Sequence, residues 1–111
     1  MNNYDLRTFF SAAVKTAVDI KTNRGLIQYL HAVNGDAAVR YIQVFNVPAA
    51  SVTLGTTVPV LVLTLAASTY NSFSFPAAVA LGGSGISVAA TTAAAGAVTS
   101  TADCVVNALY A

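Results

Sequence analysis

The sequence has few of the side chains that catalysis requires. Its 111 residues include no Trp, no Glu, one Cys and one His, and charged residues make up 8% of the chain. Globular proteins usually carry about 25% charged residues. General acid–base chemistry needs paired ionisable groups, and four Asp with one His supply little material for them. We therefore expect no enzymatic activity, and the single Cys excludes an internal disulfide.

Features of nucleic-acid-binding and membrane proteins are equally scarce. The net charge is +1 without a basic cluster, whereas nucleic-acid affinity comes largely from phosphate neutralisation by Lys and Arg. The longest strongly apolar run, residues 58–67, contains Pro59 and Thr64 and falls short of the roughly 20 residues of a spanning helix. The first ten residues lack the basic start and apolar block of a signal peptide. We therefore expect the chain to bind neither nucleic acid nor a membrane. We also expect a soluble protein that is made and used without secretion.

Charge is distributed unevenly along the chain. Nine of the ten charged or His side chains lie at or before Arg40, and residues 41–102 contain none. A free monomer normally uses surface charge to stay soluble. The uncharged stretch therefore predicts a surface that a partner covers.

Alternation with a period of two dominates, which predicts strands. In residues 1–21 the apolar and charged side chains fall largely on opposite parities. This pattern favours an N-terminal arm over residues 1–11 and a strand over residues 12–21. A short helix over residues 6–18 is the alternative, because Leu6, Phe9 and Phe10 also share a helical stripe.

Turn residues divide the remainder into short strands and predict an all-β fold. Asn34-Gly35-Asp36 indicates a hairpin, Pro76 ends a strand, and the Gly-rich residues 82–85 form a turn. The predicted strands are 25–33, 39–46, 59–65, 71–75, 86–91 and 103–110, with a rim loop over 92–101. About seven strands in all predict one two-layer β-sandwich over residues 12–111, with jelly-roll-like and Ig-like arrangements both open.

Residues 41–45 are apolar on both parities. A strand of this kind is covered on both faces. We expect the second sheet to cover one face and a neighbouring subunit the other. Tyr41, Gln43 and Phe45 are therefore the predicted oligomer interface.

No group of residues predicts a catalytic, cofactor or metal site. His31 lacks the partners of a catalytic triad, and we interpret it as a strand-surface or interface residue. Cys104 alternates with apolar residues and is interpreted as a small buried hydrophobe. Asp36 beside Asn34 offers too few carboxylates for calcium. The tyrosines are interpreted as core or interface aromatics rather than as a carbohydrate platform.

One region resembles a known group of proteins. The pattern of residues 41–46, followed by Ala50-Ser51-Val52, Gly55-Thr56-Thr57 and Pro59, is similar to that of small β-sandwich virion proteins of tailed bacteriophages. The resemblance covers residues 32–88 and includes no catalytic motif. It implies a capsid decoration, or cement, protein that binds the outside of an icosahedral shell.

The resemblance also implies partners. These are other copies of the chain, as a homotrimer, and the major capsid protein, whose neighbouring subunits the trimer would hold together. The arm would reach the coat protein through Tyr4, Leu6, Phe9 and Phe10. A phage tail or baseplate adaptor, or a host-binding module, is the alternative function. A lone carbohydrate-binding or enzymatic domain is the third class.

Overall fold

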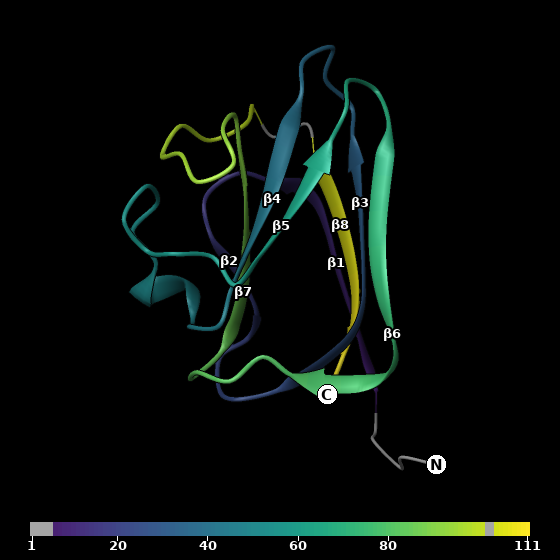
Figure 1. The fold of residues 1–111 in the computed structure, drawn as a ribbon, viewed down its shortest axis with the longest axis vertical. Coiled ribbons are helices and arrows are strands. Elements are labelled where there is room, and N and C mark those ends of the chain that lie inside the picture. Colours follow the sequence, from purple (N-terminus) through teal and green to yellow (C-terminus); the bar gives the residue numbers. More distant parts are fainter. Residues whose placement is uncertain (1–5, 102–103) are drawn as a thin grey trace.

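The chain folds into eight β-strands, as a computed structural model shows for residues 6–101 and 104–111 (Figure 1). A 3-10 helix, η1 (Ala49–Ser51), interrupts the loop between the fourth and fifth strands. The strands are β1 (Arg7–Val14), β2 (Val18–Lys21), β3 (Leu26–Asn34), β4 (Arg40–Phe45), β5 (Leu61–Leu65), β6 (Tyr70–Ala80), β7 (Ile86–Thr91) and β8 (Cys104–Tyr110).

The strands form two antiparallel sheets that pack face to face. One sheet has the order β1-β8-β3-β6 and the other the order β2-β7-β4-β5. Consecutive strands change sheet at every connection except β4–β5. Eight strands wound into two sheets in this way make a jelly roll. The predicted all-β, two-layer sandwich is confirmed, with one strand more than expected and with the jelly-roll arrangement rather than the Ig-like one.

The core lies between the sheets and is almost entirely aliphatic. Alternate side chains of each strand point inward, as the pleat requires. Ile27 and Leu30 on β3 face Ile42 and Val44 on β4, and all four are fully buried. Phe9, Phe73 and Phe75 close the cluster at its margin.

The predicted arm is wrong for residues 7–11. These residues belong to β1, which pairs with β8 from Arg7↔Tyr110 onward. The predicted strand 12–21 is in fact the end of β1 and the whole of β2, which lie in different sheets. Val14 and Ile20 are both buried, and the short, more exposed link of residues 15–17 carries the chain from one sheet to the other. Residues 1–5, including Tyr4, lie outside the described part.

Asn34-Gly35-Asp36 does not form a hairpin, because β3 and β4 lie in different sheets. The Asn34 side chain accepts the Asp36 N–H at 2.9 Å and donates to the carbonyl oxygens of Ala38 and Leu65 at 2.8 and 3.3 Å. This local bonding is an Asx-type turn. It carries the chain across the open end of the sandwich.

The strand around Pro76 also differs from its prediction. Proline lacks an N–H to donate to a ladder, so residues 71–75 were expected to end there. β6 instead continues to Ala80. It is an edge strand, where proline is tolerated, and its pairing with β3 shifts register at this level.

Candidate functional site

One outer sheet face is not covered by any other segment of the described residues, 6–101 and 104–111. In the β1-β8-β3-β6 sheet, every second side chain points away from the core, and the registers align these side chains in rows across the four strands. We call this surface the bare face. Its residues are Thr8, Phe10 and Ala12 on β1; Val105, Asn107 and Leu109 on β8; Tyr29, His31 and Val33 on β3; and Tyr70, Ser72 and Ser74 on β6.

The bare face is aromatic at both edges and uncharged throughout. Phe10 is 64% exposed at the β1 edge and Tyr70 is 71% exposed at the β6 edge. None of its twelve residues is an Asp, Glu, Lys or Arg. Five of the twelve side chains are polar, namely Thr8, His31, Ser72, Ser74 and Asn107, so the exposed apolar area is concentrated at Phe10 and Tyr70. Aromatic side chains are enriched at protein contact surfaces.

An aromatic ladder stiffens the half of the bare face nearer β6. The rings of Tyr29 and His31 stack with centroids 6.3 Å apart and planes 11° apart. His31 also lies 5.5 Å from the ring of Tyr70 at 33°. His31 occupies the middle row, opposite Asn107 on one side and Ser72 on the other. Three rings held together present a rigid surface, which loses little side-chain freedom on contact.

The opposite outer face is covered by the chain's own loops. Residues 46–60 and 92–101 both lie outside the β2-β7-β4-β5 sheet, at the left of Figure 1. Gln43 Nε2 donates to the Thr91 hydroxyl at 2.8 Å and to the Gly96 carbonyl oxygen at 3.0 Å. The Ser87 hydroxyl donates to the Val47 carbonyl oxygen at 2.7 Å.

This covering corrects the predicted oligomer interface. Gln43 and Phe45 are completely buried, so neither can contact a second subunit. Tyr41 is half-buried on the same strand. The strand is covered on both faces as predicted, but the second cover is a loop of the same chain rather than a neighbouring subunit.

No protein-family model matches the chain, and neither a curated protein nor a solved structure is significantly similar to it. Its function must therefore be argued from the geometry of its own surface.

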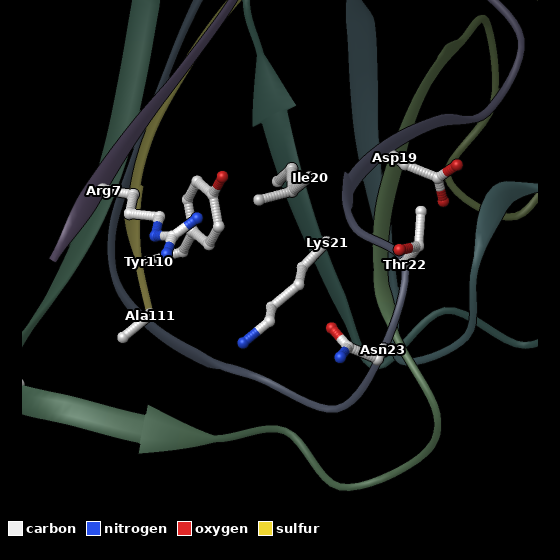
Figure 2. Close-up of a pocket in the computed structure, with 8 residues that line it drawn as sticks. All are labelled: Arg7, Asp19, Ile20, Lys21, Thr22, Asn23, Tyr110 and Ala111. Atoms are coloured by element: carbon white, nitrogen blue, oxygen red, sulfur yellow. The ribbon is translucent and has the colours of Figure 1, made fainter. Parts of the chain in front are cut away.

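A polar depression of about 700 Å³ opens between the sheets at one end of the sandwich (Figure 2). Lys21 reaches into it from β2, and Arg7 lies beside Tyr110, its partner across the β1–β8 ladder. The Asp19 carboxylate, which also lines the depression, accepts the Ala49 N–H at 2.7 Å. Its full lining is Arg7, Asp19, Ile20, Lys21, Thr22, Asn23, Tyr110 and Ala111. Two cations could attract an anionic group, but the lining holds no base beside a nucleophile.

The other candidate residues are held in structural roles. Cys104 is fully buried in the core. Asp36 pairs with Arg40 at 3.1 Å and accepts the Ala38 N–H. Within residues 6–101 and 104–111, no three His, Cys, Asp or Glu side chains come together as metal ligands. No helix in this part of the chain is long and apolar enough to span a membrane.

The predicted coat-binding residues are divided between core and surface. Phe9 packs against the core, and its pairing with the buried Ala108 fixes that orientation. Leu6 is 39% exposed just before β1. Phe10 belongs to the bare face.

Sequence reasoning did not assemble the bare face. Its residues come from four strands that are far apart in the chain, and the strand order that brings them together was left open. A signal was nevertheless present, because Tyr29, His31 and Val33 alternate with the buried Leu30 and Ala32. The interpretation of His31 as a strand-surface residue agrees with its place.

Proposed function

We propose that the chain is a viral capsid decoration protein, made in the host cytoplasm, that binds the outside of an icosahedral shell and stabilises contacts between major capsid protein subunits. The observation that carries the proposal is the bare face, a broad, uncharged and aromatic surface on a rigid two-layer framework. The viral setting is the one that the resemblance drawn from the sequence of residues 32–88 implies, and no comparison with known proteins tests it.

A flat contact surface suits a protein that acts by assembly. Many copies that each make a modest contact hold a shell firmly, because multivalency multiplies the individual affinities. An aliphatic core and eight short strands provide a stiff module for this purpose. The proposed partners are other copies of the chain, as a homotrimer, and the coat protein.

We place the coat contact at Leu6 and the residues that precede it. Leu6 is exposed and lies outside the β1–β8 ladder, so it can contact a neighbour without disrupting the sheet. Removal of residues 1–6 leaves every described strand complete, whereas removal of residues 1–11 would delete most of β1. The shorter deletion is therefore the better test of this contact.

The proposal is tested on purified particles of the virus that encodes the chain. Quantitative mass spectrometry should find the chain in numbers comparable to those of the major capsid protein, and the 1–6 deletion should lower its occupancy at least about tenfold. Absence from particles would overturn the proposal. A handful of copies per particle would favour the tail adaptor or host-binding module instead.

A further inference from the structure

The polar depression at the end of the sandwich is a site that the proposed function does not use (Figure 2). We propose that it binds a small hydrophilic molecule through a carboxylate or phosphate group, and that Lys21 and Arg7 carry the affinity. The proposal goes beyond assembly on a shell and does not depend on it, because it concerns the end of the sandwich rather than the bare face.

Both cations of the depression lack a partner among the described residues. The ion pair within residues 6–101 and 104–111 joins Arg40 to Asp36 at the other end of β3. The hydrogen bonds of the same residues include no contact of the Lys21 or Arg7 side chain. Lys21 is half-buried, and a cation that gives up part of its hydration without a counter-charge gains most from a bound anion.

The carboxylate of the depression is held away from Lys21. Asp19 and Lys21 would share one face of a regular strand, because they are two residues apart. The β2–β7 pairing shifts register between them, since Asp19 lies opposite Ser87 and Lys21 opposite Ile86. Irregularities of this kind re-aim side chains, and Figure 2 shows the Lys21 amine and the Asp19 carboxylate pointing in different directions. Asp19 is bonded to the Ala49 N–H instead, which leaves the charge of Lys21 available.

The position of the Lys21 side chain depends on a glycine. A Cβ at Gly25 would lie 2.6 Å from Lys21 Cδ and 2.8 Å from the Ala111 carbonyl oxygen. That oxygen accepts the Leu26 N–H at 2.8 Å, so it is fixed in the sheet. The lysine stem therefore runs closely over backbone that only glycine leaves open. Placement before binding lowers the entropic cost of contact with a ligand.

The rest of the lining supplies hydrogen-bond donors. Arg7 lies opposite Tyr110 in the β1–β8 ladder, and a guanidinium can give a carboxylate or phosphate two parallel hydrogen bonds. The Tyr110 and Thr22 hydroxyls and the Asn23 amide line the same depression and can donate as well. This set of donors suits a ligand rich in oxygen acceptors.

The size of the depression suits a small molecule rather than a bare ion. Its volume of about 700 Å³ lies within the roughly 300–1,000 Å³ of small-molecule sites. Its lining is polar apart from Ile20 and Ala111. The part of the ligand beyond its anionic group should therefore be hydrophilic, as in an acidic sugar or a sugar phosphate.

The test is a titration of the isotope-labelled protein at low ionic strength, followed through its amide resonances by nuclear magnetic resonance. Three probes share one sugar ring: glucose, glucuronate, and glucose phosphorylated at the carbon that is the carboxylate in glucuronate. We expect saturable shifts at the amides of Lys21, Thr22 and Ala111 with at least one charged probe, and none with glucose. The charged probe that binds more tightly identifies the anionic group. Affinity should fall as salt is added, since Arg7 is exposed and salt screens exposed charges.

Variants separate this site from a general effect of positive charge. Lys21→Gln and Arg7→Gln should each weaken binding of the tighter probe at least about tenfold, because each removes a charge-assisted hydrogen bond. The matched control is Lys15→Gln, which removes the same charge from an exposed residue outside the lining and should leave the affinity unchanged. Unchanged amide resonances of β3 verify that each variant is folded.

Three results would overturn the proposal. These are the absence of saturable shifts with both charged probes, binding of glucose as tight as that of the charged probes, and equal affinity in the Lys21→Gln, Arg7→Gln and Lys15→Gln variants. Each is independent of whether the chain is found on particles.

Discussion

The two outer faces of the sandwich are built from similar strands but meet different surroundings. On the β2-β7-β4-β5 sheet, the outward side chains of Gln43 and Phe45 are completely buried. On the β1-β8-β3-β6 sheet, the outward side chains of Phe10 and Tyr70 are 64% and 71% exposed. The difference arises from the loops, since residues 46–60 and 92–101 both lie over the first of these sheets (Figure 1).

This contrast changes the meaning of the uncharged half of the chain. Residues 41–102 include all of β4 except Arg40 and the whole of β7, and all six residues of β7 are buried. Much of the missing charge is therefore explained by burial within the chain itself. The bare face draws three of its four strands, β1, β3 and β8, largely from outside that stretch. Charge depletion along the sequence and charge depletion on a surface are separate properties.

The largest expected effect is a difference in the free energy of unfolding between a substitution on the covered face and one on the bare face. Phe45→Ala should lower the free energy of unfolding by about 3–5 kcal/mol, because it leaves a cavity under the loops. Phe10→Ala should change the stability of the monomer by less than about 1 kcal/mol, since its ring is mostly exposed. Urea unfolding monitored by tyrosine fluorescence measures both changes. Both variants are measured at the same low protein concentration, so that self-association does not contribute. Similar losses for the two would contradict the contrast.

The sequence predicts the strands better than it predicts their surroundings. Alternation and turn residues place β3 and β4 within one residue at each end, and β7 at its exact bounds. These signals are local, because pleat and turn chemistry act over a few residues. β1 was missed because Leu6, Phe9 and Phe10 are apolar on both parities, so the pattern does not distinguish a paired strand from an arm.

The candidate site depends on information that alternation does not contain. The apolar residues of strand 41–45 indicate that both of its faces are covered, but not by what. The covering segment is the loop of residues 92–101, which returns over β4 and is held there by the hydrogen bond from Gln43 to Gly96. For Tyr29 and His31, alternation with buried residues indicates that both side chains lie on the outer face of the sheet, but it does not indicate whether that face is exposed. Both outcomes follow from tertiary placement of loops rather than from strand pattern.

A second prediction tests how the cover is held. Gln43→Leu removes the hydrogen bonds to the Thr91 hydroxyl and the Gly96 carbonyl oxygen, and should cost about 1–3 kcal/mol. Gln43 Oε1 is buried without a partner among the described residues, so its removal offsets part of this loss. The loop should open locally before the sheets do. We therefore expect faster hydrogen exchange at the amide of Thr92, which donates to the Val98 carbonyl oxygen, than at amides of β3.

The control for this variant is Gln28→Leu on β3, where the side chain is half-buried and belongs to the other sheet. It should leave exchange at the Thr92 amide unchanged. Equal acceleration in both variants would mean that the loop follows global stability and that Gln43 does not hold it.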